Sequence, residues 1–405
     1  MTKSTIYPDF ESANFLNDHL SKTLAFYEDI VVDPKGGFFH SFEDDGRIYD
    51  HGLKHLVSSC RFIFDYALAY RERGEERHRQ KAEHGLAYLE SAHRQANGSY
   101  AWQIRDGKTI EGQVMAYGHA FVMICSAFAV EAGIEKAKGT LDDIWTFMET
   151  YFWDEKSGAY ADEYDKDLAV LSPYRGQNAN MHSCEGCIAA YRATSEARYL
   201  ERAEALAHKF TVELAELSGG MIWEHYDSAW TPDLEYNKDK PNDLFKPWGI
   251  QPGHLVEWAR LLLMLEAIRP KPWYLDRAKS LYENAIKHGR DEEYGGLIYG
   301  FAPDGSICAR EKYYWVHSES AATAWRLYRR TSEEKYRQEY NEIWRYSWDN
   351  LIDHDHGAWF RILTPEGKKI DNQKSPPGKT DYHTLAVCWD ILSVLHDTPN
   401  PSSAS

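Results

Sequence analysis

The stretch GGFFHSFEDDGRI, from Gly36 to Ile48, decides the fold because related stretches recur along the chain. Each copy has a glycine, alternating aromatic and polar residues, a turn and a second short extended run, which is the pattern of a β-hairpin. The other copies read NGSYAWQIRDGKT, SGAYADEYDKD, GGMIWEHYDSAWTPD, GGLIYGFAPDGSI and HGAWFRILTPEGKKI, beginning at Asn97, Ser157, Gly219, Gly295 and His356. Such internal similarity predicts repeated copies of one structural unit.

The marker glycines of the copies lie about 60 residues apart, except that the fourth unit, between Gly220 and Gly296, carries an insertion. Helical hairpins of this length either stack as an open solenoid or close into a barrel. An open array ends in atypical capping units, whereas the first and last copies here keep the motif. We therefore predict an all-α protein, an (α/α)6 barrel of six helical hairpins with short β-hairpin loops at one end. The barrel is expected to form a single domain over residues 1–405.

Two kinds of segment with helical periodicity alternate between the loops. Segments with charge on one face predict outer helices at 12–31, 75–95, 141–152, 199–217 and 333–348. Segments richer in small and apolar residues predict inner helices at 53–71, 117–130, 182–193, 254–265, 317–328 and 383–395.

The composition limits the partners of the chain. A formal net charge of −17, with acidic and basic residues mixed, argues against nucleic acid and against a membrane surface. The first 20 residues do not contain the basic stretch followed by an apolar run that marks a signal peptide. The longest apolar stretch, 120–130, is too short to span a bilayer. We therefore predict a cytoplasmic protein. The CxxC pair Cys184 and Cys187 lies on an apolar helical face, which favours packing over redox chemistry. A small neutral substrate fits best, and the oligomeric state stays open.

A polar side chain lies near the start of each predicted inner helix. These residues are Arg61, His119, His182, His254, His317 and His383. In a closed barrel the starts face one end, so we expect the six side chains to converge on one central pit. The unperturbed pKa of histidine, about 6.5, suits proton transfer at neutral pH. For His119 and His317, a structural or substrate-orienting role fits the sequence as well as a catalytic role does.

His254 and His383 are the strongest catalytic candidates. His254 lies in KPWGIQPGHLVEW, where Pro252 and Gly253 mark a helix start. Glu257 follows three residues later on the same helical face, where it can hold the imidazole by a hydrogen bond. His383 follows the turn PPGKTDYH at the start of the last inner helix. The segment HSCE repeats the first pattern, with His182 followed by Glu185.

Other chemistries have weaker support. Two HxxE pairs keep a metal site open, but HExxH spacing and dense acidic clusters are absent, so we predict no metal. No phosphate loop, GxGxxG or GxSxG motif appears, so we predict no cofactor. Because helical barrels also house paired carboxylates that cut sugar chains, a glycoside hydrolase is the main competitor. Its candidate carboxylates are Glu111, Glu185, Glu257 and Glu319. A non-catalytic sugar-binding module is the third alternative.

Five pieces of sequence resemble the N-acylglucosamine 2-epimerase superfamily, and the resemblance covers nearly the full length. The pieces are the arginine of LVSSCRF, NANMHSCEG, PGHLVEWARLLL, YYWVHSES and TDYHT. The resemblance implies an (α/α)6 barrel, no metal requirement, and catalytic histidines at His254 and His383. It further implies a sugar pocket shaped by Arg61, Tyr117, Asn178, His182, Glu257 and Trp315. PGHLVEW and NANMHSCEG are similar to the isomerase branch, whereas epimerases tend to read GHxxEAxWLL.

By this resemblance the chain is expected to be an aldose–ketose isomerase that interconverts D-mannose and D-fructose through a cis-enediol(ate). His254 would open the sugar ring and His383 would move the C2 proton to C1, although these two roles can be exchanged. Arg61 would stabilise the developing oxyanion. A sugar 2-epimerase, of the N-acylglucosamine or cellobiose type, and a sulfoquinovose isomerase are the alternatives in the superfamily. Lys246 stands where the sulfonate-handling relative is expected to carry arginine, which argues against a sulfosugar.

Overall fold

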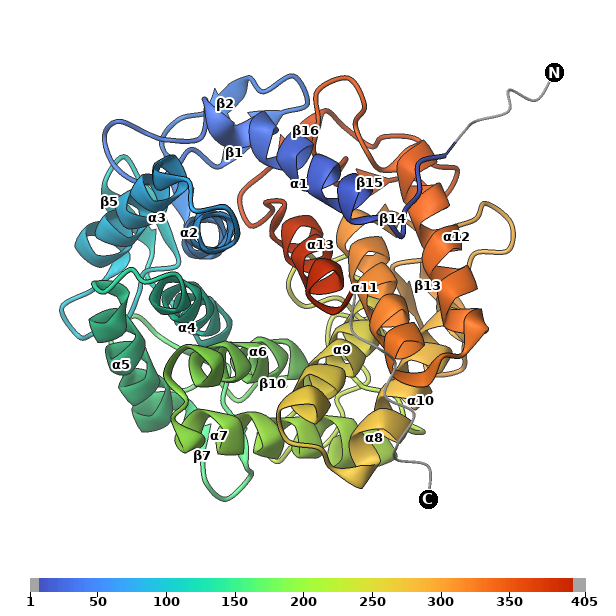
Figure 1. Cartoon of the computed structure of the whole chain (residues 1–405). Helices are drawn as coiled ribbons and strands as arrows, with labels where there is room; N and C mark the ends of the chain where they lie inside the picture. The colour runs from blue at the N-terminus through green and yellow to red at the C-terminus, as the bar shows by residue number, and fades with distance from the viewer. Residues whose placement is uncertain (1–6, 396–405) are drawn as a thin grey trace.

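The computed structural model describes residues 7–395, which form a closed ring of helices around a central axis (Figure 1). The outer helices of the described chain are α1 (Ala13–Glu28), α3 (Glu76–Tyr88), α5 (Ala137–Phe147), α7 (Ala197–His208), α10 (Pro272–Gly289) and α12 (Glu334–Asn350). The inner helices are α2 (Leu56–Arg73), α4 (Ala116–Glu131), α6 (Gln177–Thr194), α9 (Pro252–Ile268), α11 (Tyr314–Thr331) and α13 (Tyr382–Val394). The predicted (α/α)6 barrel is confirmed.

Short antiparallel strand pairs link the units at the end of the barrel where the inner helices begin. The paired strands are β3 (Leu53–His55), β4 (Gln103–Arg105) and β5 (Lys108–Glu111); β6 (Val114–Met115) and β9 (Glu163–Tyr164); β7 (Trp153–Asp154) and β8 (Ala159–Tyr160); β10 (Arg175–Gly176) and β11 (His225–Tyr226); β12 (Gly300–Phe301) and β13 (Ile307–Ala309); β14 (Lys312–Tyr313) and β15 (Ile362–Leu363). Most of these pairs join strands of neighbouring units, so each loop braces the next one around the ring.

The ring is closed by contacts between the two ends of the described chain. Strand β16 (Gln373–Ser375) pairs with β1 (Ser41–Glu43), which also pairs with β2 (Ile48–Asp50). The hydroxyl of Tyr27 on α1 donates a 2.6 Å hydrogen bond to Asp381, immediately before α13. An open solenoid has no such contacts between its first and last units, so closure is a property of this chain.

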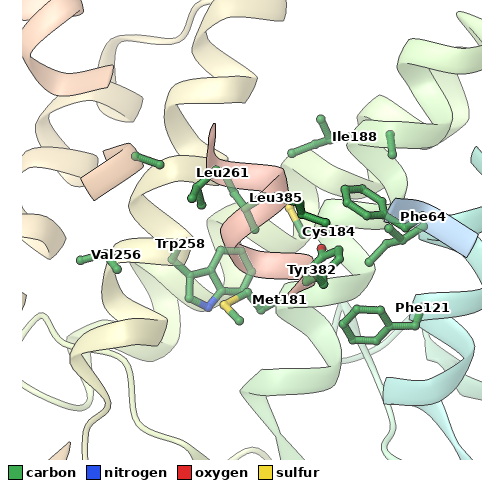
Figure 2. Close-up of a cluster of buried hydrophobic side chains, with 14 of the residues drawn as sticks. Phe64, Phe121, Met181, Cys184, Ile188, Val256, Trp258, Leu261, Tyr382 and Leu385 are labelled. Carbon is green, nitrogen blue, oxygen red and sulfur yellow. The ribbon is translucent and has the colours of Figure 1, made fainter. Parts of the chain in front are cut away.

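The inner helices are buried on nearly every face because each packs against outer helices and against other inner helices. Figure 2 shows part of this core, where side chains of α2, α4, α6, α9 and α13 pack together. The labelled residues are Phe64, Phe121, Met181, Cys184, Ile188, Val256, Trp258, Leu261, Tyr382 and Leu385. Cys184 and Cys187 are free and fully buried, as the packing interpretation predicts. No helix of the described residues is long and apolar enough to cross a membrane.

Several helix boundaries differ from the predicted ones. Three outer helices end in a π-helical turn: η1 (Leu89–His93), η2 (Met148–Phe152) and η3 (Lys209–Glu213), the last followed by α8 (Leu214–Glu216). Hydrophobic periodicity cannot separate so short a π turn from α-helix. Helix α6 begins at Gln177, before the predicted start at His182, because its polar first turn is held by hydrogen bonds rather than by an apolar face.

A buried Lys–Asp ion pair recurs in three units. The aspartate stands at the start of the hairpin loop. The lysine lies in the short strand that precedes the inner helix. The pairs are Lys54–Asp33 at 2.7 Å, Lys312–Asp291 at 2.5 Å and Lys374–Asp353 at 2.6 Å. Each lysine neutralises a carboxylate that also anchors backbone N–H groups of the loop turn. The pair therefore fixes the loop against the helix start.

We expect Lys312→Met to lower the free energy of unfolding by about 1–3 kcal/mol, because it removes the closest cation of the buried Asp291 carboxylate while the Arg310 guanidinium, 3.2 Å away, remains. Urea denaturation followed by circular dichroism measures the change. Lys335→Met is the matched control, since it breaks an exposed pair with Glu283 and is expected to change stability by at most ~0.5 kcal/mol. Equal stabilities of the two variants would contradict the bracing role of the buried pair.

Candidate active site

A pocket opens on the barrel axis where the inner helices begin. It is lined by Arg61, Tyr117, Asn178, His182, Leu244, Phe245, His254, Glu257, Tyr299, Tyr313, Tyr314, Trp315, Arg361, Ile362, Pro376, Gly378, Lys379 and His383. The structure thus brings together all eight residues that were predicted for the site, from all six inner helices. Their roles in binding or catalysis remain predictions.

Most of the eight predicted residues occupy one of two positions within their inner helices. The second helical residue lines the pocket in α4, α6, α11 and α13, as Tyr117, Asn178, Trp315 and His383. The sixth residue lines it in α2, α6 and α9, as Arg61, His182 and Glu257. Because residues four apart share one helical face, the two positions form an upper and a lower layer of the same wall.

The expectation that six polar side chains converge on the pocket is wrong for His119 and His317. Each is the fourth residue of its helix, so it points away from the axis toward the outer ring. His119 accepts a 3.1 Å hydrogen bond from the backbone N–H of Tyr100, and His317 accepts one of 2.9 Å from Leu297. Burial lowers the pKa of both imidazoles to about 4, so they are neutral acceptors. These histidines brace the loops and do not line the pocket.

His254 is held by a residue that the sequence did not indicate. Its Nδ1 lies 2.8 Å from Oε1 of Glu224, which lies within the fourth loop motif, and the Gln177 amide donates a 2.9 Å hydrogen bond to the same carboxylate. The predicted support, Glu257, points elsewhere. Because an ionised carboxylate only accepts, Nδ1 carries the proton and Nε2 presents a lone pair. Nothing in the spacing of Glu224 from His254 signals this contact, since a loop separates them.

His383 has the same arrangement with a different carboxylate. Its Nδ1 lies 2.8 Å from Oε1 of Glu319 on α11, and its Nε2 lies 3.4 Å from the Arg61 guanidinium. Burial and the charge of Arg61 hold the pKa of His383 well below its ordinary value, so the ring is neutral at pH 7. A neutral imidazole with a free Nε2 is a proton acceptor.

The carboxyl group of Glu257 closes the lower layer of the pocket. It lies 3.7 Å from Nδ1 of His383 and shares its surroundings with Glu319. Burial, together with the negative charge of Glu319, raises the pKa of Glu257 well above its ordinary value. This shift favours the protonated form of Glu257, which can donate a hydrogen bond into the pocket.

The HSCE prediction is confirmed for His182. Its Nδ1 lies 2.9 Å from Oε2 of Glu185, one helical turn away. Burial alone would raise the pKa of Glu185, but the hydrogen bond from His182 and the nearby Arg260 lower it to about 2. This imidazole is thus also fixed through Nδ1 by an ionised carboxylate.

Aromatic rings form the walls and the cover of the pocket. The indole of Trp315 lies beside both catalytic candidates, 5.2 Å from the ring of His254 and 5.6 Å from that of His383. Phe245, from the insertion in the fourth unit, packs on the rings of Trp102 and Tyr117. Such faces stack on the CH surfaces of sugars.

One trio of ionisable groups in the described residues lies close enough to ligate a metal. Single ligand atoms of Glu257, Glu319 and His383 lie within 4.8 Å of one another. However, Arg260 donates a 2.8 Å hydrogen bond to Glu319, and Arg61 faces His383, so two cations already lie against the trio. The set therefore does not fit a resident metal ion, and metal independence stays a prediction.

Lys246 does not line the pocket. Its ammonium group lies 3.1 Å from Glu163 and 4.2 Å from the centre of the Tyr174 ring. With its charge paired outside the pocket, Lys246 does not offer a cation to a sulfonate of a bound sugar.

The fold and the pocket define the class as an (α/α)6-barrel enzyme with a histidine-lined central site. The sequence profile of the N-acylglucosamine 2-epimerase (GlcNAc 2-epimerase) family matches residues 37–387. The D-mannose isomerase of Marinomonas mediterranea is 46% identical over 390 residues, which cover 96% of this chain and 99% of the relative. That of Pseudomonas cannabina pv. alisalensis is 32% identical, covering 90% of this chain and 89% of the relative.

A solved structure agrees with these matches. A crystal structure of D-mannose isomerase superposes on this chain with a TM-score of 0.95 and 46% identity, covering 96% of this chain and 100% of that one. This chain belongs to the N-acylglucosamine 2-epimerase family, and the resemblance drawn from its motifs is confirmed.

The contact between Gly253 and Trp315 gives a test of the site geometry. A Cβ atom at Gly253 would lie 2.2 Å from Cζ3 of Trp315, so we expect Gly253→Ala to displace the indole and to destabilise the protein by roughly 1–3 kcal/mol. Gly139→Ala is the control, because this helical glycine has no atom within 4 Å of the new Cβ and should gain stability. Thermal denaturation and a crystal structure of the variant measure both effects. An unmoved Trp315 with undiminished stability would show that the predicted clash is absent.

Proposed function

We propose that this chain is an aldose–ketose isomerase that interconverts D-mannose and D-fructose. The observation that carries the proposal is the pair His254 and His383, each held by a carboxylate at Nδ1 with Nε2 left as a base. Isomerisation needs such bases, because a proton must leave C2 of the open-chain aldose and arrive at C1. The likeness to D-mannose isomerases over nearly the whole chain supports this sugar.

The reaction begins with the closed sugar ring. His254 takes the proton of the anomeric hydroxyl and passes it to the ring oxygen as the ring C–O bond breaks, which leaves His254 neutral and C1 as an aldehyde. His383 then removes the C2 proton, so that the electron pair forms a C1–C2 double bond and O1 becomes an oxyanion. The O2 proton moves to O1, and the protonated His383 returns its proton to C1, which leaves a ketone at C2. Atoms and charge balance without an oxidant.

Two neighbouring groups support the negative charge that develops. Arg61, whose guanidinium lies beside Nε2 of His383, is placed to stabilise the oxyanion. Glu257, whose pKa burial raises, lines the pocket and is placed to exchange a proton with O1 and O2. Tyr117, Asn178, His182 and Trp315 are proposed to orient the sugar.

The pocket argues against the glycoside hydrolase alternative. Glycosidases flank the scissile bond with two carboxyl groups. Of the four candidates only Glu257 lines the pocket, since Glu185 and Glu319 are engaged by histidines beneath it and Glu111 lies exposed on β5. A sulfosugar substrate is disfavoured by the paired charge of Lys246.

We further propose that the ring acts as one catalytic domain over residues 1–405, of which 7–395 are described, and that the enzyme is cytoplasmic and needs neither metal nor cofactor. The formal net charge of −17 supports a small neutral ligand rather than nucleic acid. Cell fractionation tests the location.

The substrate is tested by incubating the enzyme with mannose, glucose, N-acetylglucosamine, cellobiose and sulfoquinovose, and by separating the products by chromatography. We expect mannose to give fructose faster than any other conversion proceeds, because the pocket presents bases for C1–C2 transfer. Release of reducing ends from an oligosaccharide would support the hydrolase instead.

The two bases are tested separately by His254→Ala and His383→Ala. Each variant should stay folded and lose at least ~10²-fold in kcat for mannose, the lower range for a positioned base. His208→Ala is the control, because His208 is an exposed histidine on an outer helix and should retain full activity. Near wild-type turnover in either pocket variant would remove that histidine from the mechanism.

Exhaustive chelation is expected to leave the activity unchanged, since Arg61 and the imidazoles supply the charge and the bases that the reaction needs. The assay compares mannose turnover before and after dialysis against a chelator, with wild-type enzyme in metal-supplemented buffer as control. Loss of activity that one divalent ion restores would revive Glu257, Glu319 and His383 as ligands.

A further inference from the structure

Arg260 on α9 lies beneath the pocket and contacts two buried carboxylates. Its Nε donates a 2.8 Å hydrogen bond to Oε2 of Glu319, and its Nη2 lies 3.7 Å from Oε1 of Glu185. The arginine is only 4% exposed, and Glu319 is fully buried. Glu319 therefore cannot exchange this cation for water.

Each of these carboxylates fixes one imidazole of the pocket. Glu319 accepts from Nδ1 of His383 at 2.8 Å, and Glu185 accepts from Nδ1 of His182 at 2.9 Å. The guanidinium of Arg260 thus contacts both carboxylates that hold these two histidines, which come from different helices.

The ionisation of these carboxylates decides the tautomer of the histidines. A buried carboxylate without a cation takes up a proton, because burial disfavours the charged form. For Glu319, burial raises the pKa and Arg260 is the strongest group that lowers it. The balance of the two leaves the pKa at about 7, so loss of Arg260 would shift this carboxylate toward its protonated form. A protonated Glu319 would donate its proton to Nδ1, and the imidazole would then carry its own proton on Nε2. Such a ring cannot accept a proton from the sugar.

We propose that Arg260 is a positioning residue, which keeps Glu319 and Glu185 ionised and thereby holds His383 and His182 in the tautomer with a free Nε2. Arg260 does not touch the pocket and acts only through the two carboxylates. The activity test of this inference rests on the proposed isomerase function, whereas the tautomer test does not.

A second cavity makes Arg260 accessible from the opposite end of the barrel. Arg260 and Glu185 line it together with residues near the C-terminal ends of inner helices, among them Arg71, Arg192 and Ser393. The ion network is therefore the floor between this cavity and the sugar pocket. A small guanidinium compound entering from that end can reach the space that Arg260→Ala would leave.

The experiment measures histidine ring nitrogens by ¹⁵N NMR in the full-length protein without sugar, together with kcat and KM for mannose. In wild-type protein both His383 and His182 should show a protonated Nδ1. In Arg260→Ala, His383 should shift toward protonated Nε2, with kcat reduced by at least ~10²-fold and KM changed far less. Ethylguanidinium at millimolar concentration should restore the wild-type spectrum and part of kcat.

Three further variants keep the inference falsifiable if Arg260→Ala is unstable. Arg260→Lys retains the charge and should retain the wild-type tautomers, with a smaller loss of kcat because the planar fork is lost. Glu319→Gln should alter His383 but leave His182 unchanged. Arg202→Met, which breaks a pair with Glu149 in the outer ring, should change neither histidine.

Unchanged tautomers in a folded Arg260→Ala protein would overturn the inference, and so would altered tautomers in Arg260→Lys. If wild-type protein shows the expected tautomers but does not isomerise mannose, the proposed function fails while the role of Arg260 stands.

Discussion

The period of the α-helix inside a closed ring is the constraint on which the rest of the structure depends. Strand β16 pairs with β1, so every inner helix presents one fixed face to the axis. The second and sixth residues of these helices then meet in one pocket, while the fourth points to the outer ring. A two-residue shift of the start of α11 would put the loop brace His317 at the second position, which Trp315 now occupies in the pocket wall. The buried Lys–Asp pairs that anchor the loops guard against such a slip.

The second constraint is the burial of charge. Three histidines of the pocket rest on carboxylates that are almost entirely removed from water, namely Glu185, Glu224 and Glu319. Ionised carboxylates in such places need hydrogen bonds or a cation. Glu224 receives the Gln177 amide, and the other two share Arg260. The imidazoles that we propose as bases are thus held by groups that do not line the pocket.

Repeat spacing and helix periodicity were enough to predict the barrel, its closure and the place of Arg61, His182, His254 and His383 at the pocket. Tyr117, Asn178 and Trp315 were predicted from the family resemblance, and they too line the pocket. The hydrogen-bond partner of His254 was assigned to Glu257 because the two lie three residues apart. Helical spacing reports only neighbours within one helix, and Glu224 comes from a loop that folds back over the helix start. The prediction that His119 and His317 line the pocket was wrong for a related reason. The direction in which a helical side chain points depends on its distance in residues from the helix start, not from the marker glycine. The sequence leaves that start uncertain by a few residues.

Proton transfer between C1 and C2 on one face of the sugar is the central claim, and mannose in heavy water tests it most directly. Early product analysed by NMR and chromatography should be mainly fructose, with deuterium at C1 to the extent that the proton on the catalytic imidazole exchanges with solvent. Glucose should form slowly or not at all, because returning the proton to the opposite face of C2 needs a second acid across the sugar. Glucose that forms faster than fructose, with deuterium at C2, would contradict the account and identify a 2-epimerase.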